Sequence, residues 1–266
     1  MQLVENNLIR EGDYMRINIH AGHNPDGKTG CGAVGLIKES TEARKVKFEV
    51  INILRNSGHT VYDCTVDDGT SQNDVLSKIV SKCNKHKVDL DVSIHFNSGR
   101  DDDEGDGSIG GTEVYISSSN SKAKETAERV CESISKLGFK NRGVKIASFY
   151  FLRKTNSPAM LIESCFVDDK DDIELYNYKS MAKAIVEGIV GGEVKNTTKK
   201  TATKPYKVKI TANTLNVRSG PGTSSKIVDV VKKNTIFTIV EENNGWGKLK
   251  SGAGWISLVY TKVIKE

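Results

Sequence analysis

Four side chains in this sequence have the types needed for metal binding or acid–base chemistry. His23 lies in a glycine-rich stretch, IHAGHNPDGKTG, Glu39 lies in GLIKES, and His95 lies in SIHFNS. Two histidines and one glutamate leave a position on zinc open for water, as catalytic rather than structural zinc sites do. Glu163 follows the apolar run PAMLI, and a carboxylate in a buried strand needs a partner or a task. It could orient or deprotonate the water, or stabilise a tetrahedral intermediate.

The spacing of these residues leaves a purely structural interpretation open. His23 could cap a turn, His95 could satisfy a strand edge, and Glu39 could simply begin a helix. No helical repeat ties the three together. His20 is a further candidate ligand, but on a strand it would point to the face opposite its neighbours, so we do not expect it to bind metal.

The elements that must position these residues alternate between strand-like and helix-like stretches. Strands are expected at 16–20, 59–66, 88–96, 111–117 and 158–166, and helices at 39–57, 71–83, 123–137 and 182–190. Such alternation is typical of an α/β sheet covered by helices on both faces. Loops and strand ends at one edge of an open sheet are where such folds build their sites.

The pattern changes after residue 192. Residues 193–205, EVKNTTKKTATKP, have almost no apolar side chain and are expected to be a flexible basic linker. Short β-type runs punctuated by SGPG, NNGWG and SGAG then follow, which predict a small all-β barrel over 206–266. Met15 is an alternative start, so we expect a catalytic domain over 15–192.

Composition and charge exclude several classes of protein. Hydrophobic residues make up 37% and charged residues 27% of the 266 residues, which is typical of a globular protein. No apolar run approaches the roughly 18 residues of a membrane span, so no membrane insertion is expected. Residues 193–266 carry 14 Lys and Arg against 5 Asp and Glu, whereas residues 1–192 carry 25 against 29. The basic region is expected to be drawn to a polyanion.

The five cysteines and the first residues bear on the compartment. No CxxC pair occurs, and an odd number of cysteines cannot all pair internally, so we interpret them as reduced thiols from a reducing cytoplasm. The first residues carry acids and lack an apolar signal core. The expectation is a protein made in the cytoplasm without a signal peptide.

The ordered segments IHAGHN, GLIKES, SIHFNS, GTEVYIS and PAMLIESCF resemble the zinc-dependent N-acetylmuramoyl-L-alanine amidases of the type-3 class, found in autolysins and phage endolysins. The resemblance covers roughly residues 16–190. It implies a twisted mixed sheet flanked by helices, Zn²⁺ held by His23, Glu39 and His95, and a catalytic role for Glu163. The family often has Asp before AGH and a Gly pair after it, where this chain has His20 and Asn24-Pro25.

The basic region resembles bacterial SH3-like domains through LNVRSGPG, a Gly-Trp-Gly and a Gly-Trp-Ile-Ser segment. Such domains are thought to hold wall hydrolases on peptidoglycan. Trp255 is interpreted as a core residue of the barrel. Trp246, beside two glycines, is expected to be exposed on the surface.

These resemblances imply a peptidoglycan hydrolase that cleaves the bond between N-acetylmuramic acid and L-alanine and acts on the wall after release, as a phage endolysin does. A mother-cell autolysin with the same chemistry and a zinc peptidase acting on stem peptides are the alternatives. Expected partners are peptidoglycan and anionic wall polymers, not nucleic acid. The acidic loop DDDEGDGSIGG is close to a calcium-loop pattern, but its strand-like flanks favour a solvated loop.

Overall fold

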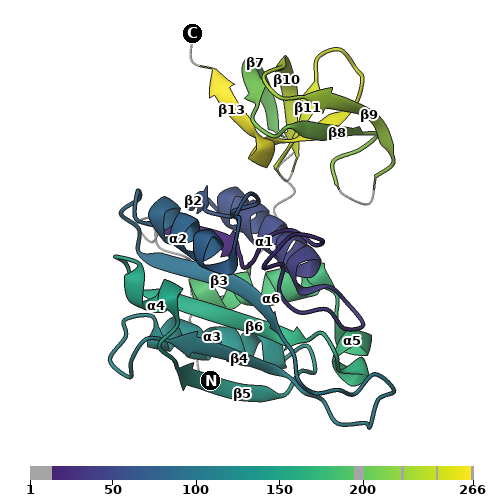
Figure 1. The fold of residues 1–266 in the computed structure, drawn as a ribbon. Helices are drawn as coiled ribbons and strands as arrows, with labels where there is room; N and C mark the ends of the chain where they lie inside the picture. Colours follow the sequence, from purple (N-terminus) through teal and green to yellow (C-terminus); the bar gives the residue numbers. More distant parts are fainter. Residues whose placement is uncertain (1–13, 195–200, 223–224, 244, 265–266) are drawn as a thin grey trace, which may run out of the picture. The chain divides into compact units, whose positions relative to one another are not determined.

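The computed structural model describes residues 14–194, 201–222, 225–243 and 245–264. They belong to two compact units, residues 1–194 and residues 195–266 (Figure 1). The expected linker 193–205 lies partly outside the described residues. Strand β7 already begins at Thr201, so the linker prediction was wrong at its carboxyl end. Thr201 and Ala202 pair with β10. Because this pairing is made by the main chain, it does not require apolar side chains, and the sequence therefore shows no sign of a strand here.

The first unit is built on a six-stranded sheet with the order β2-β1-β3-β6-β4-β5. The strands are β1 (Arg16–Ala21), β2 (Thr60–Asp63), β3 (Leu90–Asn97), β4 (Thr112–Ile116), β5 (Asn141–Ile146) and β6 (Ala159–Phe166). Strands β2, β1, β3 and β6 are parallel, and β4 runs antiparallel to β6. The sheet is therefore mixed, as the family resemblance implied.

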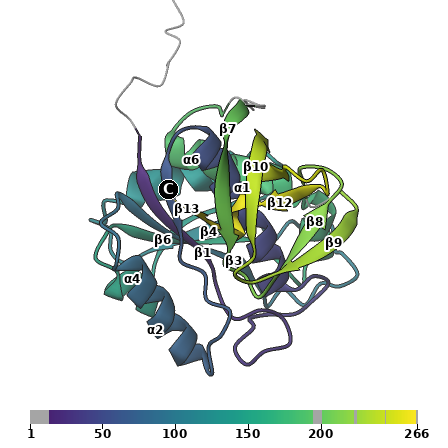
Figure 2. The same ribbon diagram turned by 90° about the horizontal axis from the view of Figure 1, so that it is seen from above.

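Helices cover both faces of this sheet. Helices α1 (Glu39–Asn56) and α6 (Tyr178–Val190) lie on one side of it, and α2 (Gln72–Cys83) and α4 (Tyr150–Lys154) lie on the other (Figure 2). Helix α3 (Lys124–Ser135) packs against α6. In the part of the chain that is described, no helix combines the length and the apolar character needed to cross a membrane.

Helix α1 illustrates how the sequence produces its local structure. Ala43, Val46, Val50 and Leu54 recur at helical spacing, and all four are fully buried. The helix thereby fixes its first residue, Glu39, against the edge of the sheet. The predicted helix over 39–57 is confirmed, with its end at Asn56.

Three short elements were not expected from the sequence: β5, α4 and α5 (Lys170–Leu175). Strand β5 is a half-exposed edge strand without the apolar alternation that marks strands. The two helices have five and six residues, too few for a helical period to appear. Helix α6 begins at Tyr178, four residues before the expected 182, because the Asn177 side chain accepts hydrogen bonds from two N–H groups of the first turn.

The second unit is an antiparallel sheet with the order β13-β7-β10-β11-β12-β8-β9. Its strands are β7 (Thr201–Ile210), β8 (Thr214–Arg218), β9 (Ile227–Lys232), β10 (Ile236–Asn243), β11 (Trp246–Leu249), β12 (Trp255–Ser257) and β13 (Thr261–Ile264), with a 3₁₀ turn, η1, at Leu258–Tyr260. Seven apolar side chains form its core: Val208, Ile210, Leu215, Val217, Ile239, Leu249 and Ile256. This all-β architecture confirms the predicted class of the unit.

The two tryptophans of this unit are both buried. Trp255 is 8% exposed, as predicted, but Trp246 is only 4% exposed, so the expectation of a surface ring was wrong. The neighbouring Gly247, which suggested an exposed position, instead faces the core. A Cβ atom there would lie 2.7 Å from Leu258 and 2.8 Å from Ile239, so the glycine allows close packing of β11.

Candidate metal centre

His23 lies in the loop that follows β1. Its backbone is in the left-handed region (φ 64), which turns the chain sharply after Gly22. A Cβ atom at Gly22 would lie 2.0 Å from Cε1 of His95, so only glycine lets the loop approach that ring. The loop is anchored by Asn24, whose side chain donates to the carbonyls of Thr29 and Gly69. Strand, loop and anchor together set the position of the His23 imidazole.

Glu39 is the first residue of α1 and is 3% exposed. Its Oε2 accepts a hydrogen bond from the Ala33 N–H (2.8 Å), and its Oε1 accepts one from the Phe96 N–H (3.2 Å). Burial raises the pKa of Glu39, but hydrogen bonds to His23 and His95 outweigh burial and bring the pKa below its usual range. A helix N-terminus also favours a negative charge. The carboxylate is therefore ionised and fixed in place.

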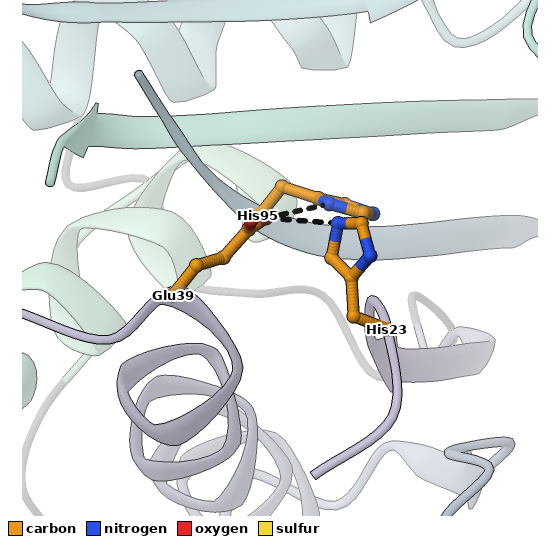
Figure 3. Close-up of side chains that lie close together, drawn as sticks. All are labelled: His23, Glu39 and His95. Carbon is orange, nitrogen blue, oxygen red and sulfur yellow. Dashed lines mark hydrogen bonds and ion pairs between the residues drawn. The ribbon is translucent and has the colours of Figure 1, made fainter. Parts of the chain in front are cut away.

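His95 lies near the end of β3 and completes a convergent set (Figure 3). Its Nδ1 is 3.0 Å from Oε1 of Glu39, and Nε2 of His23 is 3.2 Å from the same oxygen. The two imidazole rings meet edge to face with centroids 4.9 Å apart. Burial lowers the pKa of His95, which favours the neutral ring that a metal requires.

The ligand atoms of these three residues all lie within 4.8 Å of one another. Two imidazole nitrogens and one carboxylate oxygen form the donor set expected for zinc, with a fourth position left for water. The residues present therefore fit a catalytic zinc ion. The sequence suggested His23, Glu39 and His95 from their types, and the fold brings them together from a loop, a helix start and a strand.

Glu163 lies on β6, directly beside His95 in the register of the sheet. Its Oε2 is buried and has no hydrogen-bond partner, and none of the ion pairs between described residues includes Glu163. The alternative of a structural pair is not seen, because Arg153 instead donates to the Ser148 carbonyl. Burial raises the pKa of Glu163 to about 8, and the charges of Glu39 and Glu113 add to that rise.

These residues border a cavity of about 240 Å³ on the face of the sheet that carries α2 and α4. His23, His95 and Glu163 lie on its polar side. Apolar and aromatic side chains form most of the remaining wall, among them Leu76, Phe149 and Tyr150, together with Gln72. Gln72 and Leu76 lie on the helix expected at 71–83, whereas nothing in the sequence indicated Phe149 and Tyr150, because α4 has only five residues. An apolar cleft with a few convergent polar groups is typical of a ligand site.

His20 borders the same cavity but is not part of the His–Glu–His cluster. It is 2% exposed and its ring meets Phe151 edge to face at 4.6 Å. Burial lowers its pKa to about 3, and the proximity of His95 adds to that effect. A neutral ring packed on an aromatic side chain fits a structural role.

The cysteines and the acidic loop, the other candidate functional features of the sequence, have structural explanations. All five cysteines are free thiols, and four of them are buried. Asp102 and Asp106 of the acidic loop lie close to Asp171, which the calcium-loop pattern did not include. Glu113, which follows the loop, forms an ion pair with Arg142 at 2.9 Å. Backbone N–H groups of the acidic loop bond to Asp102 and Asp171, which accounts for their arrangement without a cation.

The fold and this residue set define a class of protein: a helix-covered mixed sheet with a candidate catalytic metal centre, joined to a small all-β unit. A family model described as N-acetylmuramoyl-L-alanine amidase matches residues 17–192, and one described as bacterial SH3 domain matches residues 213–262. The chain belongs to the N-acetylmuramoyl-L-alanine amidase family and carries a bacterial SH3 domain.

Individual relatives agree with this assignment. The chain is 37% identical to an uncharacterised protein of Clostridium perfringens, over 70% of this chain and 54% of that protein. It is 31% identical to the endolysin of Bacillus phage SPP1, over 68% of this chain and 66% of the endolysin. It therefore spans between half and two thirds of the length of these relatives.

The same fold occurs in the solved catalytic domain of an endolysin targeting Clostridia Difficile. The match has a TM-score of 0.61 and 28% identity, and covers 68% of this chain and 100% of that domain. The catalytic domain of an amidase from Bacillus (Paenibacillus) polymyxa matches with a TM-score of 0.54 and 27% identity, over 66% of this chain and 97% of that one. These two matches confirm the predicted fold class.

Proposed function

We propose that this chain hydrolyses the amide bond between N-acetylmuramic acid and the L-alanine of the peptidoglycan stem peptide. The observation that carries the proposal is the convergence of His23, Glu39 and His95 beside a cavity that His23, His95 and the unpaired Glu163 line. Family membership supports the choice of bond, since the matched family is that of N-acetylmuramoyl-L-alanine amidases.

His23, Glu39 and His95 would hold a zinc ion. When bound there, zinc would polarise the scissile carbonyl and bring the pKa of a water molecule towards neutrality. The backbone N–H groups of Ala33 and Phe96 hold the Glu39 carboxylate, and the Gly22 backbone packs against the His95 ring. Such supporting contacts orient ligands before the metal arrives.

Glu163 would move the proton that the reaction requires. Water adds to the carbonyl carbon, the C–N bond breaks, and one proton passes from the water to the departing amine. A carboxyl group that exchanges its proton near neutral pH suits this transfer, and burial holds the Glu163 pKa at about 8. The side chain makes no competing ion pair among the described residues.

The bacterial SH3 domain would keep the enzyme on its polymeric substrate. The partner that this predicts is peptidoglycan, and the site of action is the bacterial cell wall. The domain match at residues 213–262 and the basic balance of residues 193–266 support this role.

Product analysis tests the proposal most directly. Purified walls digested with the protein should gain free L-alanine amines while the glycan strands stay intact, as mass spectrometry would detect. EDTA should abolish clearing and added zinc should restore it. New amines on other stem-peptide residues, with the bond to L-alanine intact, would instead identify a peptidase.

A further inference from the structure

The outward face of the second unit carries a row of lysines that no catalytic role explains. Along β7 the side chains alternate: Val208 and Ile210 are buried in the core, whereas Lys207 and Lys209 are exposed. Two positively charged side chains therefore project from the same face of one strand.

Neighbouring strands place two more lysines on that face. Strand β13 pairs with β7 so that Lys262 lies directly opposite Lys209. On the other side, Thr238 of β10 lies opposite Lys207, and its carbonyl accepts a hydrogen bond from the N–H of Lys250. Strands β13, β7 and β10 lie side by side in Figure 1. We call Lys207, Lys209, Lys250 and Lys262 the lysine face.

This arrangement is unfavourable unless an anion is present. Like charges directly opposite one another on paired strands are destabilising, and Lys209 and Lys262 are such a pair. Among the described acids of the unit, Glu241 pairs with Lys248, two residues before Lys250, and Glu242 accepts a hydrogen bond from Tyr206. Neither of these two described acids forms an ion pair with Lys209 or Lys262. Among the described residues, no ion pair involves Lys209, Lys250 or Lys262.

The chemistry of the face selects the kind of anion. Lysines are flexible point charges that recognise phosphate by charge, without the fixed bidentate geometry of arginine. Four of them spread over adjacent strands suit a polymer with regularly repeated charges better than a single small anion. Positions 207, 209, 236, 238, 250, 262 and 264 of this face carry no aromatic residue. Trp255, opposite Lys248 on the same side of the sheet, is only 8% exposed, which disfavours stacking with nucleic acid bases.

We propose that the lysine face binds a phosphodiester polymer attached to the cell wall, so that the SH3 unit reads the anionic polymer in addition to peptidoglycan. This proposal rests on the proposed function, since it assumes that the protein works on walls. It assigns the expected anionic wall polymer to a defined surface and narrows its chemistry to phosphodiesters.

Co-sedimentation of the full-length protein with walls at low temperature, before clearing begins, tests the proposal. One set of walls is untreated, and the other is treated with hydrofluoric acid, which removes phosphodiester polymers and leaves peptidoglycan. The variant Lys209→Gln/Lys262→Gln removes two charges from the face. The matched control, Lys226→Gln/Lys232→Gln, removes two exposed charges at and beside β9, at the other end of the strand order.

Each lysine near an anionic surface strengthens binding by about fivefold, so the face variant should bind untreated walls about 30-fold more weakly. The control should change by less than about threefold, and stripped walls should bind wild type and face variant equally. Inorganic phosphate at the same phosphate concentration should not compete with untreated walls for the protein, since it lacks the regularly repeated charges of a polymer. Wild-type binding that is not weakened by stripping the walls, or an equal loss in both variants, would overturn the proposal.

Two further measurements separate this proposal from its rivals. Duplex DNA that is bound more tightly than untreated walls would show that the face serves nucleic acid, and would also overturn it. Cleavage of soluble muropeptides is measured on the same preparations. Absence of new L-alanine amines there would contradict the proposed amidase function, whatever the wall binding.

Discussion

The two units of this chain use charged residues in opposite ways. In the first unit, His23, Glu39 and His95 come from distant parts of the sequence and converge on one oxygen atom. In the second, lysines are spread over neighbouring strands and point outward. The first unit buries its polar groups beside a cavity, whereas the second exposes them to solvent.

This contrast predicts how each unit responds to change. A convergent site depends on every member, because one lost ligand or one displaced ring removes the geometry that the others require. A dispersed cationic face acts through the sum of its charges, so each loss is partial and screened by salt. The first unit should therefore fail abruptly under single substitutions, and the second should weaken by degrees.

The largest effect is expected from His95→Ala. Removing one of three ligands should eliminate zinc binding, and with it all wall clearing. His20→Gln should retain zinc, since His20 packs on Phe151 outside the cluster. Metal analysis of both purified variants measures this. Full zinc occupancy in His95→Ala would show that His95 is not a required zinc ligand and would contradict a convergent site.

The next effect in size is that of Glu163→Gln. This change keeps the volume of a side chain on a buried strand but removes its acid–base chemistry. Zinc content and wall binding should stay near normal, while turnover on soluble muropeptides falls by about 10²–10⁴-fold. Circular dichroism provides the check on folding. A folded, zinc-loaded variant with near wild-type turnover would show that Glu163 has no catalytic role.

Gly22→Ala tests how closely the site is packed. The new Cβ atom would lie 2.0 Å from Cε1 of His95, so the ring or the loop must move. Disturbing the surroundings of a metal ligand typically costs about 10–100-fold in metal affinity. Gly192→Ala is the matched control, because a Cβ atom there would have no neighbour within 4 Å. Equal zinc affinity in the two variants would argue against close packing at the site.

We propose that the two units fold independently, and fragments test this. Residues 15–192 should fold and cleave soluble muropeptides alone. A fragment of residues 201–266 should melt at a higher temperature than one of residues 206–266, because the longer fragment keeps the pairing of Thr201 and Ala202 with β10. An inactive, unfolded 15–192 fragment would contradict independent folding.

Strong periodic signals made much of the first unit predictable. The apolar spacing of α1 and the continuous apolar run of β6 identified both elements. His23, Glu39 and His95 form one cluster, and His23, His95 and Glu163 line one cavity. Their zinc binding and catalysis remain predictions. The reversal of β4 and the cavity wall at Phe149 and Tyr150 could not be foreseen, because tertiary pairing rather than local sequence decides them. The burial of Trp246 was not predicted for the same reason, since it also depends on tertiary packing.

The smallest expected effect concerns pH, and it again separates the units. Asp91 on β3 is 1% exposed and accepts a hydrogen bond from the Asn18 amide (2.7 Å). Burial raises its pKa from 3.8 to about 6, although the bond from Asn18 opposes that rise. Among the described residues, the second unit buries no carboxylate.

The sign of the Asp91 effect follows from proton binding. Between about pH 4 and pH 6 the folded state holds a proton that the unfolded state has released, so the stability of the first unit should fall as pH rises through this window. Above this window the loss of stability is constant. Asp91→Asn keeps an acceptor for Asn18 and should flatten this dependence in thermal melts. The second unit's melting transition should not change with the substitution. If Asp91→Asn leaves the pH dependence of the first unit's stability unaltered, another group controls that dependence. Asp91 would then not account for a difference in pH response between the two units.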